Sequence, residues 1–137
     1  MHALLDTGFL YALLDQSDQH HATVVEIITD FQGDLLLPTA VLVELTYLLQ
    51  ARLGHNRMRQ FIGQFLKQSI HLIAITPIDL IRITQLLDQY ADVRLDFVDA
   101  VIVAIAERLN IQNILTVDRR DFLIIRPQHC PHFMLLP

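Results

Sequence analysis

Apolar and polar positions follow two different periods along this chain, one typical of buried strands and one typical of amphipathic helices. Short apolar runs that end at a polar residue, a glycine or a proline predict strands. Apolar residues that recur every three or four positions predict helices between them. The predicted strands cover residues 3–5, 35–37, 70–76 and 114–117, with edge strands at 122–125 and 133–136. The predicted helices cover residues 9–14, 20–31, 40–53, 57–66, 78–90 and 97–109.

Strand and helix patterns alternate from one end of the chain to the other, which favours a parallel sheet with helices on both faces. The chain has 137 residues, of which 53% are hydrophobic and 18% charged, and it shows no repeat and no linker. We therefore expect a three-layer α/β fold over residues 1–137, with a mostly parallel central sheet of about five strands in one domain.

The apolar runs, the single cysteine and the net charge bear on where the protein is located and on what it binds. No apolar run reaches the roughly 18 residues of a membrane span, no basic segment precedes the apolar start, and Cys130 is the only cysteine. These features predict a cytoplasmic protein without disulfides. The formal net charge of −5 disfavours a nucleic-acid partner, unless bound cations change the balance locally.

Four acidic residues stand where polar side chains are least expected. Asp6 and Asp118 follow predicted strands, Asp99 lies in the first turn of the last long helix, and Glu44 lies on or beside an apolar helix stripe. Ligands collect at the carboxyl ends of parallel strands, so these acids are expected at one edge of the sheet. Clustered buried carboxylates repel one another unless cations bind them, and all-oxygen sites suit magnesium or manganese.

Structural roles remain open for each of these acids. Asp6 could be a turn residue, and Glu44 could be solvated at the rim of its helix. Asp96 and Asp99 could form a capping-box pair, with Asp96 as the N-cap. Asp118 could open a turn, and Asp121 is interpreted as a surface partner for a neighbouring arginine, Arg119 or Arg120.

The four segments that contain these acids resemble the acidic motifs of the PIN-domain ribonucleases. The segments are LLDTGFLYALLD, TAVLVELTYLL, LDFVDAVIVAIAERL and ILTVDRRDF, in the order and at about the spacing of that family. A small chain of this kind is similar to the VapC-like toxins of bacterial toxin–antitoxin pairs. The resemblance implies that the catalytic, metal-holding acids are Asp6, Glu44, Asp99 and Asp118. It implies supporting roles for Thr7 and Thr116, and makes Asp96 a possible additional ligand.

The resemblance also implies an activity and partners. The expected activity is hydrolysis of RNA phosphodiester bonds, dependent on Mg²⁺ or Mn²⁺, by a toxin that a separate antitoxin silences and that forms a homodimer. Arg119 and Arg120 are candidates for binding RNA phosphates. A second basic group either binds RNA or forms a solvated helix face; it comprises Arg52, Arg57, Arg59 and Lys67.

Two alternatives belong to other functional classes. A PIN-like module without catalytic activity could bind RNA or a protein, but the complete acidic quartet disfavours it. A receiver domain also has a magnesium pocket at strand ends, but it needs a lysine late in the chain, and the only lysine is Lys67. The histidines around Cys130 lie in a proline-containing tail that lacks the four-ligand spacing of a zinc site.

Overall fold

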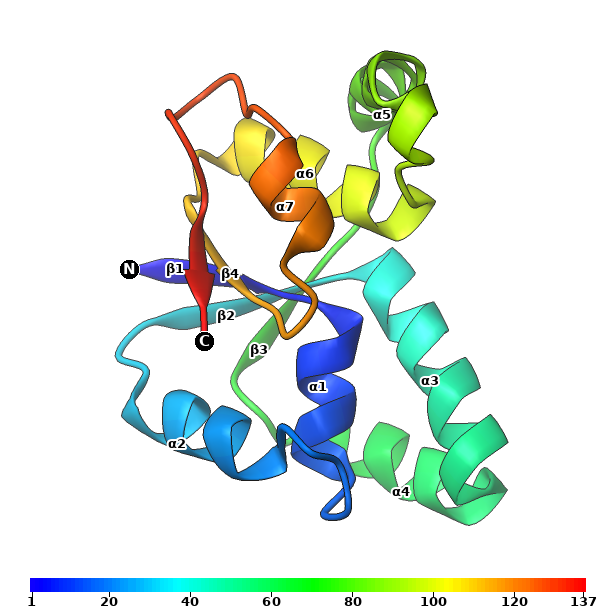
Figure 1. Ribbon diagram of the computed structural model, residues 1–137. Helices are drawn as coiled ribbons and strands as arrows, with labels where there is room; N and C mark the ends of the chain where they lie inside the picture. The colour runs from blue at the N-terminus through cyan, green and yellow to red at the C-terminus, as the bar shows by residue number, and fades with distance from the viewer.

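Five short strands pair in parallel at the centre of the computed structural model, which describes residues 1–137 (Figure 1). They are β1 (His2–Leu5), β2 (Asp34–Pro38), β3 (Ile70–Ile73), β4 (Asn113–Leu115) and β5 (Met134–Leu136). Their order across the sheet is β3-β2-β1-β4-β5. The chain builds outward from β1 through β2 to β3 and then returns to the other side of β1, so the strand order reverses between β1 and β4. Ligands of open α/β sheets bind at such a switch point.

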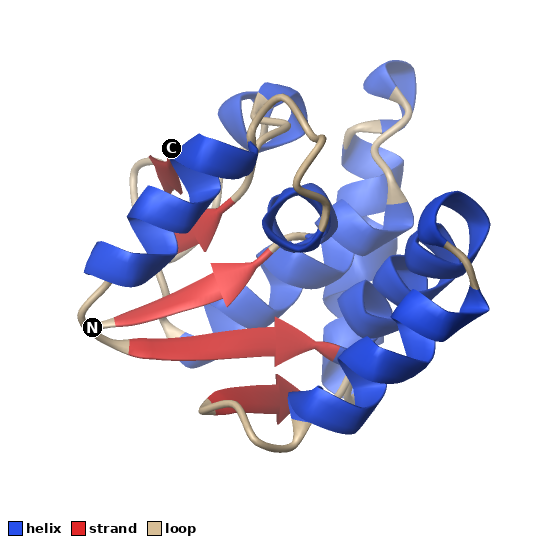
Figure 2. Ribbon diagram, turned by 90° about the horizontal axis from the view of Figure 1, so that it is seen from below, coloured by secondary structure: helices blue, strands red, loops and turns tan.

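Seven α-helices and a short 3₁₀ turn (Ala91–Val93) surround this sheet. The helices are α1 (Thr7–Leu14), α2 (His21–Asp30), α3 (Thr39–Leu53), α4 (His55–Phe65), α5 (Pro77–Gln89), α6 (Phe97–Leu109) and α7 (Arg120–Ile124). Helices α1 and α2 lie on one side of the sheet, and α6 and α7 lie on the other (Figure 1). The strand arrows of Figure 2 point the same way, toward the end where α1 and α3 begin.

Helix α6 contains the longest continuous buried stretch of any helix in the fold. Every residue from Ala100 to Ala106 is buried, and the three alanines in that stretch let the helix approach the sheet closely. Strand β1 is buried from Ala3 to Leu5, as expected for a central parallel strand. The segment directly after β1 and the segment directly before α6 are therefore both held in place by the core.

The predicted fold class is confirmed, but one predicted element has the wrong type and another has the wrong end. Residues 122–125, predicted as an edge strand, belong mainly to α7, where Phe122 and Ile125 are buried and Leu123 and Ile124 are exposed. A four-residue apolar run does not distinguish a strand from a helical turn. The strand predicted over 70–76 ends at Ile73, because Thr76 and Asp79 form the capping box that starts α5. None of the helices has the length and apolar character that crossing a bilayer requires.

Candidate active site

Asp6 stands at the carboxyl end of β1, at the switch point. Leu5 pairs with Leu115 of β4, and the Asp6 amide donates to the Leu115 carbonyl at 3.0 Å, so Thr116, the first residue after β4, lies beside Asp6. The carboxylate accepts the Thr7 amide at 2.8 Å and lies 2.7 Å from the Thr116 hydroxyl. That hydroxyl is also 2.9 Å from the main-chain oxygen of Asp118. Asp6 is therefore held in one orientation by the backbone and by β4.

Burial raises the pKa of Asp6 from 3.8 to about 6, although its two hydrogen bonds oppose the increase. The negative charges of Glu44 and Asp118 contribute to this increase. Only 6% of the residue is exposed. A carboxyl group in this environment needs either a proton or a cation.

Asp99 lies in the first turn of α6 and is half-buried. Burial raises its pKa well above the ordinary value, and so do a hydrogen bond with Asp121 and the charges of Asp6, Asp121 and Asp96. Asp6 and Asp99 thus lie within electrostatic reach of each other, although 93 positions separate them in the sequence. The two acids reach this edge from opposite sides of the sheet, one at the start of α1 and the other at the start of α6.

Glu44 and Asp118 lie farther out around Asp6. Glu44 is half-buried on α3, and Asp118 is exposed in the turn between β4 and α7. The Asp118 carboxylate accepts the Arg120 amide at 3.3 Å, so Asp118 does open a turn. Asp99, Glu44 and Asp118 therefore all lie within electrostatic reach of Asp6; Asp99 and Glu44 are half-buried, and Asp118 is exposed.

The sequence left two structural roles open at the start of α6: Asp96 as the N-cap and Asp99 as its capping-box partner. The structure shows the first role but not the second. Asp96 is the N-cap, and its side chain accepts the Val98 amide at 3.0 Å. Asp99 does not complete a capping box with it, because its carboxyl group contacts Asp121 instead.

The sequence model of the PIN domain family matches residues 3–126, which contain every acid described above. The chain belongs to the PIN domain family. Ribonuclease VapC26 of Mycobacterium tuberculosis is 28% identical over 134 residues, which cover 98% of this chain and 99% of the relative.

Solved structures of similar fold accompany this match. One is VapC20 of Mycobacterium tuberculosis, a Sarcin-Ricin loop cleaving toxin, with a TM-score of 0.76 and 24% identity over 82% of this PIN domain and 86% of that chain. Another is a toxin-antitoxin complex from Klebsiella pneumoniae, with a TM-score of 0.66 and 20% identity over 96% of this chain and 99% of that chain. At these identities, the likeness establishes the shared fold.

The residues of this PIN domain fit a hard divalent cation by their chemistry. The donors are carboxylate and hydroxyl oxygens, which Mg²⁺ and Mn²⁺ prefer. None of the protein's ion pairs reaches the quartet acids, and the buried Thr7 hydroxyl has no hydrogen-bond partner. In the present side-chain positions no three Asp, Glu, His or Cys groups converge on one point. Binding an ion would therefore require the outer carboxylates to turn inward.

Asp121 is the acid whose place the sequence interpretation missed. It does pair with an arginine, Arg120, at 3.7 Å, but its side chain is only 12% exposed and its carboxyl contacts Asp99. The prediction of a strand over 122–125 concealed this position, because a strand gives no reason to direct Asp121 toward α6. The helical spacing of Phe122 and Ile125 could have indicated it.

The second basic group lies away from these acids. Arg57 donates to the Leu14 carbonyl at 2.6 Å, at the opposite end of α1 from Asp6. Arg52 lies over the ring of Tyr11, 4.9 Å from its centroid. These cations have local structural partners, whereas Arg119 and Arg120 remain exposed beside Asp118.

Proposed function

We propose that this PIN domain is an endoribonuclease that depends on Mg²⁺ or Mn²⁺ and is the toxin of a toxin–antitoxin pair. One observation carries the proposal: carboxylates gather around Asp6 at the switch point, and the protein supplies them with no cation of its own. The similarity to Ribonuclease VapC26 and to VapC20 supports RNA as the substrate.

In this proposal each acid has a defined task. Asp6 and Asp99 hold the ions from the buried side, and Glu44 and Asp118 complete the site from the solvent side. The Thr7 amide and the Thr116 hydroxyl keep the Asp6 carboxylate oriented. When bound, one or two divalent ions lower the pKa of water and neutralise charge that develops on the phosphoryl oxygens. No protein nucleophile is required. Arg119 and Arg120, exposed at the same edge, bind RNA phosphates.

Cleavage of total RNA by the purified chain tests this proposal. Activity is expected with Mg²⁺ or Mn²⁺, is expected to disappear with a chelator, and is expected to fall by at least about a thousandfold in Asp6→Asn and Asp99→Asn. Asp88→Asn is the matched control, because Asp88 is an exposed acid on α5. Equal cleavage by wild type and both site variants would refute the assignment. Metal binding without any cleavage would favour the non-catalytic alternative.

An apolar groove between α1, α2 and α4 is the surface that we propose for the antitoxin. Its walls are mainly Leu10, Leu13, Leu14, Ile28, Phe61 and Phe65. Arg57 and Lys67 stand at its rim, so a helix with an apolar face and acidic flanks would complement it. The toxin-antitoxin complex of similar fold supports a separate partner. Phe61→Glu is expected to weaken capture of the antitoxin expressed with this chain at least tenfold, whereas Ile62→Glu, at an exposed neighbouring position, is not.

A second copy of the chain is the partner that we propose for an exposed apolar patch beside Glu44. Val43, Tyr47 and Phe97 line a shallow groove there, and the two residues of α3 are 70% and 71% exposed. Contiguous exposed apolar surface of this kind is typical of protein interfaces. The wild type is expected to sediment as a dimer and Tyr47→Lys as a monomer. A dimer that survives this substitution would place the interface elsewhere.

A further inference from the structure

The C-terminal segment, residues 127–137, forms one edge of the sheet and contacts the residue that orients Asp6. The PIN domain match ends just before this segment, at residue 126. Strand β5 of the segment pairs in parallel with β4, and the Leu136 carbonyl accepts the Thr116 amide at 2.8 Å. Thr116 is also the residue whose hydroxyl lies 2.7 Å from the Asp6 carboxylate. A strand outside the matched residues is therefore one hydrogen bond away from the support of Asp6.

Strand β5 is weakly held by its own residues. It is three residues long, lies at the edge of the sheet with β4 as its only neighbour, and has no fully buried residue. Short edge segments with few buried contacts open locally at a low free-energy cost. Keeping β5 on the edge of β4 therefore requires contacts outside the strand.

His129 provides such a contact through its side chain. Its Nε2 lies 2.6 Å from the carbonyl oxygen of Ile111, two residues before β4. Because a carbonyl oxygen only accepts, Nε2 carries the proton and donates. The ring also contacts Phe133, with the centroids 5.8 Å apart, and the buried Phe133 meets Phe122 of α7 edge-on at 6.1 Å. One side chain thus joins the C-terminal segment to the start of β4 and, through Phe133, to α7.

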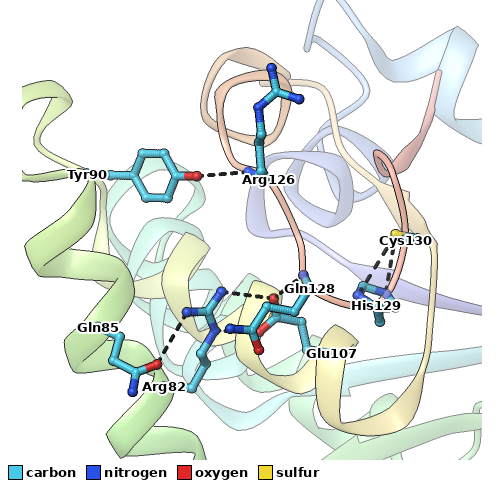
Figure 3. Close-up of polar contacts among 8 residues, drawn as sticks. All are labelled: Arg82, Gln85, Tyr90, Glu107, Arg126, Gln128, His129 and Cys130. Carbon is cyan, nitrogen blue, oxygen red and sulfur yellow. Dashed lines mark hydrogen bonds and ion pairs between the residues drawn. The ribbon is translucent and has the colours of Figure 1, made fainter.

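The chain before His129 is fastened by main-chain amides (Figure 3). The Arg126 amide donates to the Tyr90 hydroxyl at 2.9 Å, and the Gln128 amide donates to the Glu107 carboxylate at 2.7 Å. Neither contact uses a side chain of the C-terminal segment. The hydrogen bond from His129 is therefore the contact of this segment that a substitution within the segment can remove selectively.

We propose that His129 is a positioning residue for RNA cleavage, because it keeps β5 on the edge of β4. With β5 in place, the Leu136 carbonyl holds the Thr116 amide, and the Thr116 hydroxyl orients the Asp6 carboxylate. His129 acts at the beginning of β4, away from the acids at its carboxyl end. The inference rests on the proposed function, in which Asp6 holds the ions. Small displacements of positioning groups lower reaction rates strongly.

Two substitutions at His129 test this role. His129→Leu removes the hydrogen bond to the Ile111 carbonyl and retains an apolar side chain against Phe133. His129→Gln retains a side-chain nitrogen that can donate to the same carbonyl. His132→Leu is the matched control, because His132 is an exposed histidine of the same loop whose ring contacts only the carbonyl of the next residue.

The first measurement is steady-state RNA cleavage in Mg²⁺, at a temperature where thermal unfolding shows every variant to be fully folded. We expect kcat of His129→Leu to fall about tenfold, the lower end of the usual cost of losing a group that supports a metal ligand. KM should change less than about twofold, because the exposed Arg119 and Arg120 remain to bind RNA. His129→Gln should recover most of kcat, and His132→Leu should match the wild type.

The second measurement is amide hydrogen exchange, which reports on β5 without any cleavage. In His129→Leu the Thr116 and Met134 amides, which donate across the pairing of β4 with β5, should exchange at least about tenfold faster. The Ile102 amide in the buried part of α6 reports on opening of the whole domain. Its rate should increase by a clearly smaller factor.

Each contrary result overturns a distinguishable statement. If His129→Leu leaves the exchange of Thr116 unchanged, or speeds it while kcat stays at the wild-type value, His129 does not position the site and the proposed function stands. If only the melting temperature falls, or if His129→Gln loses as much kcat as His129→Leu, the hydrogen bond has no positioning role and the inference fails. If the wild type cleaves no RNA with Mg²⁺ or Mn²⁺, the proposed function fails together with this inference.

Discussion

Two groups of acidic residues in this protein have opposite electrostatic environments. The first lies between α5 and α6, where Arg108 holds Asp79 at 2.8 and 3.0 Å and Arg82 holds Glu107 at 2.6 and 3.1 Å. Burial opposes ionisation of Asp79, whose side chain is 1% exposed, but the hydrogen bonds from Arg108 and from Thr76 outweigh it. The pKa of Asp79 is therefore lowered.

The second group lies at the carboxyl edge of the sheet, where the pKa values of Asp6 and Asp99 are raised. Desolvation is the largest single influence on the pKa of Asp79, of Asp6 and of Asp99, so desolvation alone does not explain why the pKa of Asp79 is lowered and the other two are raised. The two groups differ in whether an arginine pairs with the acids. Asp79 and Glu107 form ion pairs that connect α5 to α6, whereas Asp6 and Asp99 have no arginine partner and can bind an external cation. The first group contributes to stability, and the second reduces it until an ion or a proton binds.

Removing the cation from the paired group should produce the largest loss of stability. Arg108→Leu leaves Asp79 buried without its partner, and breaking a buried pair in this way costs about 3–5 kcal/mol. Urea unfolding at pH 7 measures this change, and Arg126→Ala, at an exposed arginine without an ion pair, should cost under about 0.5 kcal/mol.

The pH dependence of stability tests whether the ion pair between Asp79 and Arg108 stabilises the folded protein. Because the folded pKa of Asp79 lies below 3.8, the stabilisation is present above that value and is lost as the pH falls through the folded pKa. A loss for Arg108→Leu that does not shrink at all as the pH falls further and further below 3.8 would contradict the ion-pair explanation.

Removing a charge from the unpaired group should have the opposite effect. The folded pKa of Asp6, about 6, lies above its ordinary 3.8, so between these values the folded state retains a proton that the unfolded state releases. The stability of the wild type in chelator therefore falls as the pH rises through this window, and the full cost of up to about 3 kcal/mol applies above it. Asp6→Asn removes this cost.

The comparison of Asp6→Asn with the wild type by urea unfolding is informative at two pH values. At pH 8 the variant should be more stable by about 1–3 kcal/mol, and near pH 3.5 the gain should vanish. The asparagine amide can donate to the Thr116 hydroxyl, which then donates to the Asp118 carbonyl, so no buried group loses its partner. A variant that is less stable at pH 8 would show that Asp6 serves the fold.

An intermediate loss is expected at Glu107, which joins α5, α6 and the segment after α7. Glu107→Gln keeps an oxygen for the Gln128 amide but removes the charge that Arg82 binds. Losing a charge-assisted hydrogen bond costs about 1.5–3 kcal/mol, and the neutral bond that remains should limit the loss to about 1–2 kcal/mol. Thermal unfolding measures it, with Gln85→Ala as the control for the weak 3.4 Å contact of Arg82. A loss of the same size in both variants would rule out the ionic contribution.

The sequence predicted that the four acids lie near one another because its information is local and periodic. Apolar runs that end at Asp6 and near Asp118 identify strand ends, and the topology of a parallel sheet brings strand ends together. The order and spacing of four motifs then strengthened each weak indication. Where the pattern was short it failed, as in residues 122–125, whose four apolar residues fit a strand or a helical turn.

The partners of the individual acids could not be predicted from the sequence, for a different physical reason. Nothing in the sequence joins Asp79 to Arg108 or Asp99 to Asp121, because these contacts depend on how helices pack in three dimensions. The same limit applied to Asp96, for which a helix cap and a metal ligand require the same residue type at the same position. The hydrogen bond to the Val98 amide now supports the cap, while the proximity to Asp99 leaves a ligand role to be tested.

Two substitutions at Asp96 separate these roles and should have the smallest effects. Asp96→Ala removes the N-cap and is expected to cost about 1 kcal/mol, whereas Asp96→Ser retains a hydroxyl that caps the helix and should cost a few tenths at most. If Asp96 is only a cap, the serine variant cleaves RNA and binds Mn²⁺ as the wild type does, because the carboxylate charge is not needed. If the serine variant is as stable as the wild type but binds Mn²⁺ tenfold more weakly, Asp96 belongs with the unpaired acids. Its position at the start of α6, exposed and three residues before Asp99, favours the first outcome.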